Sequence, residues 1–504
     1  MKLITLSCLL LTVVTTHAAS FTVANTPAAI QTCHDSQASD GDTIQVLPGT
    51  NTWTTQVTLT KAIALVGQGV LGGGWTTVVT PNNSMSTPIL TMNPTGTKIQ
   101  RVSGFKFTGG LQDYNGGRLN ASGNSIISTN WFTSMGGFNI YSLDSAPLIT
   151  SNRFEHMVGS SIFCYDSDIH YGGHSYGDGS WNATVDFSGT NWVTYEHNYF
   201  DFGQSGGYAA IDGLSGVRRI VRFNFFKNLS IEGHGTESGQ RFRGIRACQV
   251  YGNTFDNPNH GLISMYNCRS GTGIVCSNMA TGLSYTNALT LNNERIFCPF
   301  TPWGAADGTN LWDVNLGLQL SGTATGGGTA TLTDASKAWT IDQWRGYVLK
   351  NLTRNWSSEI TGNTSTILTV STDSKCATPV GHAGDQYSIY LLDFILDQPG
   401  KGRGSLISGD DPSPVGWPNE VTEPFYVWNN TNDGAVAPVA VNSGFLVERL
   451  NQQYILGSLP GWTPMPYPSP LLGYTNTPPP VAGPSPVVIS GRVELTGTIK
   501  IYPQ

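Results

Sequence analysis

The feature of this 504-residue chain that most limits its fold is a short pattern of asparagine, any residue and phenylalanine. It recurs as NWF, NRF, NYF, NFF and NTF, beginning at Asn130, Asn152, Asn198, Asn224 and Asn253. The successive spacings are 22, 46, 26 and 29 residues, and the value of 46 fits two turns, or one turn with a long loop. Repeats of this length indicate stacked units that bury a core only against their neighbours.

We therefore predict an all-β chain whose main body is a right-handed parallel β-helix. Short strands would turn Phe, Val and Ile inward, and neighbouring coils would cover the edges of each strand. Asparagine at a coil corner tolerates left-handed backbone geometry and can hydrogen-bond to the next coil. A β-propeller would need blade repeats of about 40–50 residues with a blade signature, and the sequence shows none.

The repeat stops near Leu320, where a turn-rich segment predicts a small antiparallel β domain inserted into the β-helix. The predicted organisation is a signal peptide at 1–18, β-helix at 19–319, the insert at 320–392, a return to the β-helix at 393–474, and a proline-rich linker with a terminal strand at 475–504. The insert carries Trp339, Trp344 and Trp356. We interpret these tryptophans as its core, with a sugar-stacking face as the alternative.

The chain begins MKLITLSCLLLTVVTTHAAS, in which a lysine precedes an apolar run and small residues follow. This pattern predicts a secretory signal peptide, because the run is too short to span a membrane. We expect a secreted, extracellular protein with no membrane span. A net charge of −7 does not suggest nucleic-acid binding, which favours basic surfaces.

Composition points toward sugars rather than charged partners. The chain has 60 glycines and 13 tryptophans, while only 12% of its residues are charged. Of its 8 cysteines, Cys8 lies in the predicted signal peptide, so an odd number remains and one must stay unpaired within a monomer. We interpret the cysteines as structural, and Cys268 and Cys276 are close enough in sequence to close a short disulfide loop.

Four polar segments follow one another between residues 191 and 255: NWVTYEHN, AAIDGL, RRIVRFNFF and GHGTESGQRFRGIRACQVYGNTF. If they occupy similar places on successive coils, their outward side chains line one long groove. A groove along a stack of coils suits an extended polysaccharide better than a small metabolite.

This ordered set resembles the family 1 pectate lyases of the pectate-lyase-like β-helix superfamily. The resemblance implies a lyase in which Glu196 and Asp212 hold calcium, Arg241 is the base and Arg246 binds a substrate carboxylate. The sequence departs from the family where Arg243 replaces a proline and Glu196 replaces an aspartate. The wider pattern, with GDGSW, the Arg-x-Arg-Gly-x-Arg run and EPFYVWNNT, resembles secreted β-helix proteins for which no activity is known.

The chemistry of elimination can be assigned to more than one residue. Arginine is a poor base unless its surroundings disfavour the cation, whereas an ordinary histidine has a pKa of ~6.5. We therefore keep both Arg241 and His234 as candidate bases, with Arg243 as a substrate-binding cation. The alternative for the arginines is pairing with Glu232, Glu237 or Asp256.

The segment from Asp166 to Trp181 is the other unusual stretch, and it is expected to line the groove. Its aromatic residues Tyr171, Tyr176 and Trp181 are candidates for stacking on sugar rings. Asp166 and Asp168 begin an Asp-x-Asp pattern that suits calcium through oxygen ligands, although the remaining spacing of a calcium loop is missing.

The leading hypothesis from the sequence is a lyase that cleaves an acidic, uronate-containing polysaccharide by β-elimination. A glycoside hydrolase is the first alternative and needs two carboxyl groups about 5–10 Å apart. Asp186, Glu196, Asp212 and Glu237 are available for such a pair, and the sequence does not say which of them face each other. A carbohydrate-binding, adhesin-like β-helix without activity is the second alternative, since one scaffold hosts many functions.

Overall fold

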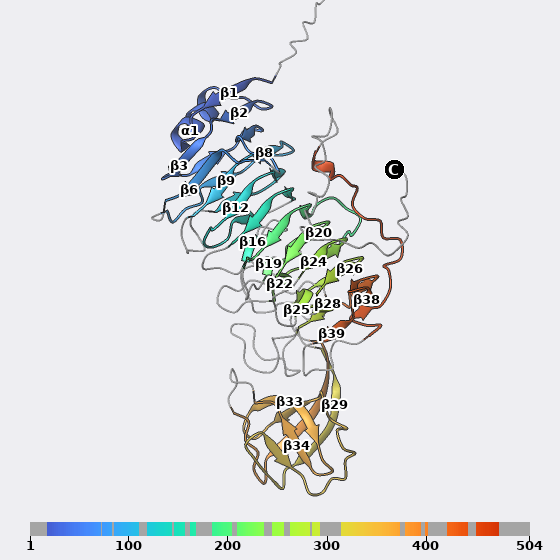
Figure 1. Ribbon diagram of the computed structural model, residues 1–504. Coiled ribbons are helices and arrows are strands. Elements are labelled where there is room, and N and C mark those ends of the chain that lie inside the picture. Colours follow the sequence, from blue (N-terminus) through green and yellow to red (C-terminus); the bar gives the residue numbers. More distant parts are fainter. Residues whose placement is uncertain are drawn as a thin grey trace, which may run out of the picture.

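A computed structural model of the chain shows a right-handed parallel β-helix with a separate antiparallel β domain at one end (Figure 1). The structure describes residues 18–71, 73–82, 85–109, 118–143, 146–156, 162–167, 184–203, 209–235, 244–256, 263–282, 285–292, 314–372, 378–394, 399–401, 421–441 and 450–472. The predicted fold class is confirmed. Within these residues no helix is long and apolar enough to cross a membrane.

Three long sheets form the walls of the β-helix, and we call them sheets A, B and C. Sheet A has the order β1 (Ser20–Val23), β2 (Thr43–Val46), β5 (Ala64–Val66), β8 (Gln100–Ser103), β11 (Ser125–Ser128), β14 (Leu148–Thr150), β17 (Val193–Glu196), β20 (Arg218–Arg222), β23 (Ala247–Tyr251), β26 (Thr272–Cys276), β36 (Phe425–Trp428) and β40 (Tyr454–Ile455). Sheet B has the order β3 (Gly49–Trp53), β6 (Thr77–Pro81), β9 (Lys106–Thr108), β12 (Trp131–Thr133), β15 (Arg153–Glu155), β18 (Tyr199–Asp201), β21 (Phe225–Lys227), β24 (Thr254–Asp256), β27 (Met279–Thr281), β37 (Thr431–Asn432) and β38 (Ala435–Val436).

Sheet C completes each coil. Its order is β4 (Val57–Leu59), β7 (Leu90–Met92), β10 (Leu119–Ala121), β13 (Ile140–Leu143), β16 (Ile162–Ser167), β19 (Ala209–Leu214), β22 (Ser230–Gly233), β25 (Ile263–Cys268), β28 (Tyr285–Leu291) and β39 (Val439–Val441). Along the chain the strands alternate between the sheets, so consecutive strands of one sheet belong to consecutive coils. A residue on one coil therefore has an in-register neighbour on the next, about 4.8 Å away.

The Asn-x-Phe repeat forms two ladders along the axis of the β-helix. Each side-chain amide donates to the side-chain oxygen of the next asparagine in the series Asn130, Asn152, Asn198, Asn224, Asn253, Asn278 and Asn430. Two residues later, the rings of Phe132, Phe154, Phe200, Phe226 and Phe255 stack inside the core with centroids 4.6–5.1 Å apart. The repeat thus fixes both the corner and the core of each coil.

The left-handed residue at each corner is not the asparagine itself, which corrects the expectation from the sequence. It is the residue before it, as in Ser151, His197 and Phe223, whose φ values are 55°, 56° and 57°. The chain changes direction at that residue. The side chain of the asparagine that follows then hydrogen-bonds to backbone and side-chain groups of the neighbouring coils.

Removing one rung of the asparagine ladder is expected to destabilise the protein strongly. Asn198 accepts from the backbone and side-chain nitrogens of Asn152 at 3.0 and 3.1 Å, and donates to the carbonyl of Ile149 at 2.8 Å and to Asn224 at 3.0 Å. Asn198→Ala leaves these buried groups unsatisfied, at about 1–3 kcal/mol each. Chemical denaturation should show a loss of roughly 3 kcal/mol or more, whereas the exposed Asn93→Ala should change stability by less than about 0.5 kcal/mol. Equal effects of the two changes would show that the ladder contributes nothing specific.

A helix that the sequence analysis did not predict lies at the N-terminal end of the β-helix (Figure 1). In α1 (Pro27–Ser36), the hydroxyl of Thr26 accepts from the backbone nitrogen of Ala29, which caps the helix, and a proline occupies its first position. Ile30 and Cys33 of this helix join the core of the β-helix. The helix therefore covers the open end of the first coils.

The inserted domain is a seven-stranded antiparallel sheet at the opposite end of the β-helix (Figure 1). Its order is β29 (Val314–Thr323), β35 (Gln386–Phe394), β32 (Val348–Asn351), β33 (Trp356–Asn363), β34 (Ile367–Val370), β31 (Thr331–Thr333) and β30 (Gly326–Gly328). Trp339 belongs to its buried core, and Trp344 and Trp356 pack against that core. The core interpretation of these tryptophans is confirmed.

The outer face of sheet A is covered by the chain itself. Residues 459–472, which we call the C-terminal strap, run back along the β-helix and end in η1 (Pro470–Leu472) (Figure 1). Met465 of the strap is buried among outward residues of sheet A such as Ile220 and Tyr251, and Leu459 and Trp462 pack against the same cluster. This face is therefore closed to a long polymer where the strap lies.

The suggested disulfide between Cys268 and Cys276 is wrong, because both thiols are free. Cys268 belongs to the interior core behind sheet C, whereas Cys276 lies in the outer cluster of sheet A. Each side chain therefore belongs to a different packing layer, despite the short separation in sequence.

Candidate functional site

One row of side chains on the outer face of sheet C gathers polar and aromatic groups. It contains Tyr141, Tyr165, Asp212, Glu232 and Asn267 on five consecutive strands. Tyr165 pairs with Asp212, and Ile211 pairs with Ile231, so the residues that follow them, Asp212 and Glu232, are neighbours. Ile211 and Ile231 belong to the interior core, which places the two carboxyl groups on the outer face by strand alternation.

Glu232 is a buried carboxyl group whose surroundings favour its protonated form. Asn267 donates to its two oxygens at 3.2 and 2.9 Å, and the Nε of Arg269 lies 3.1 Å from Oε1. Burial first, and then the negative charge of Asp212, raise the pKa of Glu232 to about 8, and these effects outweigh the nearby arginine.

Asp212 is equally buried but ionised. Its Oδ2 lies 2.9 Å from Nδ1 of His234, and its Oδ1 accepts from the backbone nitrogen of Gly213 at 2.7 Å. Burial by itself would raise the pKa of Asp212, but His234 and the cations Arg269 and Arg219 together hold it below its ordinary value. The surroundings thus shift the pKa values of two neighbouring carboxyl groups in opposite directions, which is the arrangement expected of an acid and its ionised partner.

His234 links the ionised carboxylate to a cation. Its Nδ1 lies 2.9 Å from Asp212 and 2.6 Å from Nη2 of Arg269. One nitrogen cannot donate to the carboxylate and accept from the guanidinium at once, so the tautomer decides which contact is a hydrogen bond. When Nδ1 carries the proton and donates it to Asp212, the lone pair of the ring lies on Nε2, and Nε2 can act as a base.

The raised carboxyl pKa values predict a protein that is more stable in mild acid. Burial raises the pKa of Glu232 to about 8 and that of Asp166 to about 6, so between about pH 4.5 and 8 the folded state binds more protons than the unfolded state. The free energy of unfolding should therefore fall as pH rises through this window, by about 1.4 kcal/mol per pH unit for each proton. Denaturation of the protein and of its Glu232→Gln form from pH 5 to 9 measures this. The variant should lose the part of the slope that belongs to Glu232, and equal slopes would contradict the assignment.

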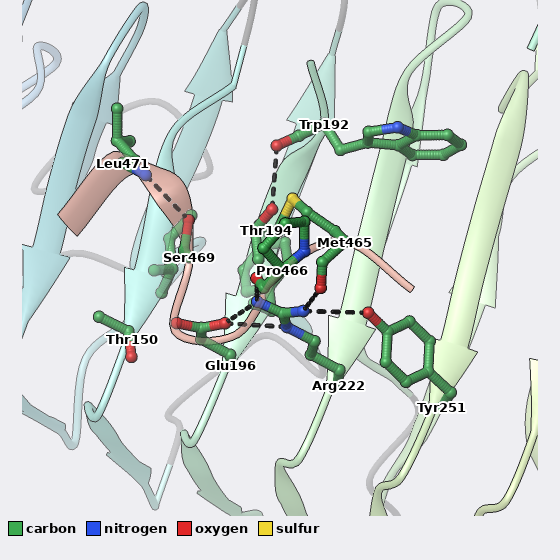
Figure 2. A network of polar contacts seen from close by, with 12 residues as sticks. Thr150, Trp192, Thr194, Glu196, Arg222, Tyr251, Met465, Pro466, Ser469 and Leu471 are labelled. Carbon is green, nitrogen blue, oxygen red and sulfur yellow. Dashed lines mark hydrogen bonds and ion pairs between the residues drawn. The ribbon is translucent and has the colours of Figure 1, made fainter. Parts of the chain in front are cut away.

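The structure brings Asp212 and His234 together and separates Glu196 from both. Glu196 lies on β17 of sheet A, where Arg222 donates to its Oε2 at 2.9 and 2.6 Å under the C-terminal strap (Figure 2). Because Glu196 and Asp212 belong to different sheets and to different networks, they do not share an ion. The calcium pairing that the resemblance implied is therefore corrected.

Calcium binding elsewhere in the chain remains a prediction, and Asp212 has the following contacts. The ion takes six to eight oxygen ligands, whereas both oxygens of Asp212 are bound to His234 and to a backbone nitrogen. Across the described ranges, no group of three or more His, Cys, Asp and Glu residues could hold a metal.

Arg246 does not reach the outer face as expected. Its side chain is fully buried, and its Nη2 forms an ion pair at 2.7 Å with Glu423, which follows far later in the chain. The chain does turn at Gly244, where a Cβ atom would meet the side chain of Ser270 at 2.4 Å and the carbonyl of His234 at 2.6 Å. That turn carries Arg246 into the protein instead of into a groove.

The remaining predicted site residues lie outside the described parts of the chain. They are Arg241, Arg243, Tyr171, Tyr176 and Trp181. Their assignments as base, substrate-binding cation and sugar-stacking rings remain predictions.

Two central residues of the site were not identified from the sequence as functional. The sequence suggests Glu232 only as an ion-pair partner, and no motif points to Arg269. The signal for Glu232 was present in SIEG, where alternation turns Ile231 inward and the acid outward, directly before the His234 segment. Arg269 follows its strand by one residue, and only the stacking of coils places it beside Glu232 and His234.

Comparisons with known proteins leave the family open. No family model matches the chain. No curated protein matches it. Among solved structures, an alginate lyase from Paenibacillus sp. str. FPU-7 aligns at 12% identity and a TM-score of 0.31, over 55% of this chain and 82% of the other. ORF18 of Geobacillus virus E2 aligns at 15% identity and a TM-score of 0.34, over 78% of each chain. A tailspike protein of E. coli bacteriophage HK620, solved with a pentasaccharide, aligns at 11% identity and a TM-score of 0.30, over 70% and 82%.

Proposed function

We propose that this protein is a glycoside hydrolase that cleaves an extended polysaccharide on the outer face of sheet C. Glu232 donates the proton and Asp212 is its ionised partner. The observation that carries the proposal is the neighbouring pair of buried carboxyl groups, whose surroundings move the pKa of one up and of the other down. The signal-peptide-like start of the chain supports a polymer outside the cell as the substrate.

The reaction needs an acid on the leaving group and a carboxylate at the sugar carbon. Protonated Glu232 gives its proton to the glycosidic oxygen, and Asp212 attacks or stabilises the developing positive charge at the anomeric carbon. Their strands are adjacent and in register, with a spacing of about 4.8 Å. The separation of the two carboxyl groups decides the stereochemical outcome, since it is about 5–5.5 Å in retaining enzymes and about 6.5–9.5 Å in inverting ones.

A lyase remains the second candidate, supported by the contacts of His234. Asp212 orients the imidazole, Nε2 can take the proton next to a uronate carboxylate, and Arg269 supplies a cation that can neutralise that carboxylate. Glu232 would then protonate the leaving oxygen. This lyase mechanism is the β-elimination that the resemblance to family 1 pectate lyases implied. It requires neither calcium nor Arg246.

One assay separates the three functions. The protein is incubated with pectate, alginate, glycosaminoglycans and neutral glucans, and both new reducing ends and the absorbance of unsaturated products are recorded. Reducing ends without unsaturation support the hydrolase, and nuclear magnetic resonance of the fresh products reports the anomeric configuration. Unsaturated products support the lyase. Glycan binding without either product would overturn both and favour the adhesin-like alternative.

A further inference from the structure

A cluster of charged and polar side chains occupies the interior of the β-helix, where most of the described core residues are apolar or aromatic. Asp166 on β16, Tyr195 on β17 and Arg219 on β20 are all fully buried. Nη1 of Arg219 lies 3.3 Å from Oδ2 of Asp166, and the hydroxyl of Tyr195 donates to the other oxygen of the same carboxylate. We call these three residues the interior cluster.

Arg219 reaches across the interior from sheet A to sheet C. Its Nη2 donates to the backbone carbonyl of Glu232, the proposed proton donor. The in-register neighbours of Arg219 on sheet A are Val193 and Cys248, so the arginine interrupts a row of small, uncharged side chains. One guanidinium thus joins the carboxylate of one coil to the backbone of another.

Each residue of the proposed acid pair is followed by a glycine, and the first of these glycines, Gly213, leaves room for the interior cluster. Gly213 follows Asp212, and a Cβ there would meet the carbonyl oxygen of Asp166 at 2.6 Å and its Cβ at 2.8 Å. Gly233 follows Glu232, and a Cβ there would meet the hydroxyl of Tyr266 at 2.6 Å. Each carboxyl group on the outside is therefore followed by an inward position that holds no side chain, and polar groups of the interior approach it closely.

A buried ion pair contributes little net stability to a protein core. Desolvation of both charges commonly exceeds their attraction, and apolar residues of similar volume often stabilise a protein equally well or better. A role beyond filling space would explain why the pair lies behind Glu232 and bonds to its backbone.

We propose that Arg219 is a positioning residue for the proposed hydrolase, holding the backbone of Glu232 so that its carboxyl group stays beside Asp212. This inference rests on the proposed function. The ion pair with Asp166 fixes the guanidinium, and the guanidinium fixes the carbonyl of Glu232 relative to β16 and β20. A misplacement of about 1 Å at a reacting group can lower a rate on the order of 100-fold.

The test compares Asp166→Asn with the double change Asp166→Asn and Arg219→Met. Asparagine keeps an acceptor for Tyr195, and the double change leaves no buried charge unpaired, so we expect it to fold. Relative to Asp166→Asn, the double variant should lose kcat by about 10- to 100-fold, while KM changes by less than about threefold. Arg153→Met on the outer face of sheet B removes a cation far from the site and should leave kcat unchanged.

A second readout needs no substrate. The difference in unfolding free energy between a protein and its Glu232→Gln form, followed from pH 5 to 9, reports the titration of Glu232. Among the residues that the structure describes, the charged groups that face Glu232 are Asp212 from β19, His234 from the turn after β22, and Arg269 from the turn after β25, and the double change keeps all of them. When the backbone loosens, Glu232 should become hydrated and titrate at lower pH.

The two readouts separate failure of this inference from failure of the proposed function. A folded double variant with the kcat and the Glu232 titration of Asp166→Asn would reduce the interior cluster to core filling. If the protein cleaves no polysaccharide at all, the proposed function fails, and the titration still shows whether Arg219 holds Glu232. Should the double variant not fold, the comparison is repeated with Arg219→Lys, which keeps the charge but not the forked geometry. Full kcat in that variant would also overturn the proposal.

Discussion

Replacing Glu232 by glutamine is expected to abolish cleavage of the polysaccharide, with a loss of kcat on the order of 100- to 10,000-fold. Glutamine keeps the volume and the hydrogen bond from Asn267, but it cannot give a proton to the leaving oxygen. The fold should persist, since the change removes a buried group whose ionisation is costly. Rates are measured from new reducing ends, with thermal unfolding as the check on folding.

Glu359→Gln is the matched control for this change. Glu359 lies in β33 of the inserted domain, and burial raises its pKa to about 7, so it is also a buried carboxyl group with a raised pKa. Its replacement should leave cleavage unchanged. If Glu232→Gln retains full activity, or if both variants lose activity equally, Glu232 is not the proton donor.

Replacing Arg222 by methionine is expected to lower the free energy of unfolding by about 3–5 kcal/mol, because it leaves Glu196 as an unpaired buried charge. Arg222 also donates to the hydroxyl of Tyr251 at 3.1 Å, and to the carbonyls of Met465 and Pro466 in the strap at 2.6 and 3.0 Å (Figure 2). The same change should therefore loosen the strap. Chemical denaturation measures the first effect, and limited proteolysis near residues 459–472 measures the second.

The paired variant Arg222→Met with Glu196→Gln is the control for the charge. It removes the unpaired carboxylate while the strap carbonyls stay without their donor. Most of the lost stability should return, but the strap should remain sensitive to protease. A single variant as stable as the original protein would show that this network does not anchor the strap.

The fold followed from the sequence because its signals are local and repeated. Each Asn-x-Phe unit specifies a corner and an inward ring, and the ladder from Asn130 onward joins units with the same geometry. The helix α1 was missed because its signals, Thr26 as the cap and a proline at the first position, occur once and outside the repeat.

Only part of the candidate site could be predicted from the sequence. Asp212 and His234 are both predicted from the sequence and lie together, because Asp212 lies on β19 and His234 directly follows β22, the next strand of sheet C. The order of the motifs suggests that Glu196 lies with them, but Glu196 directly precedes the corner at His197 and ends a strand of sheet A, whereas Asp212 lies on sheet C. Arg246 was assigned by motif, and its partner Glu423 comes from a segment that returns to the β-helix after the insert.

The sequence by itself determined the coil, since a repeat of about 25 residues with an asparagine corner and an inward phenylalanine can bury its core only by stacking. The tertiary structure decided which side chains meet across coils and which sheet face the C-terminal strap covers. Glu232 lies beside Asp212, Arg219 behind them and the strap over Glu196, because contacts between coils join residues 13 to more than 200 positions apart. No local pattern encodes such distances, and the charges of these groups are set only after burial brings them together.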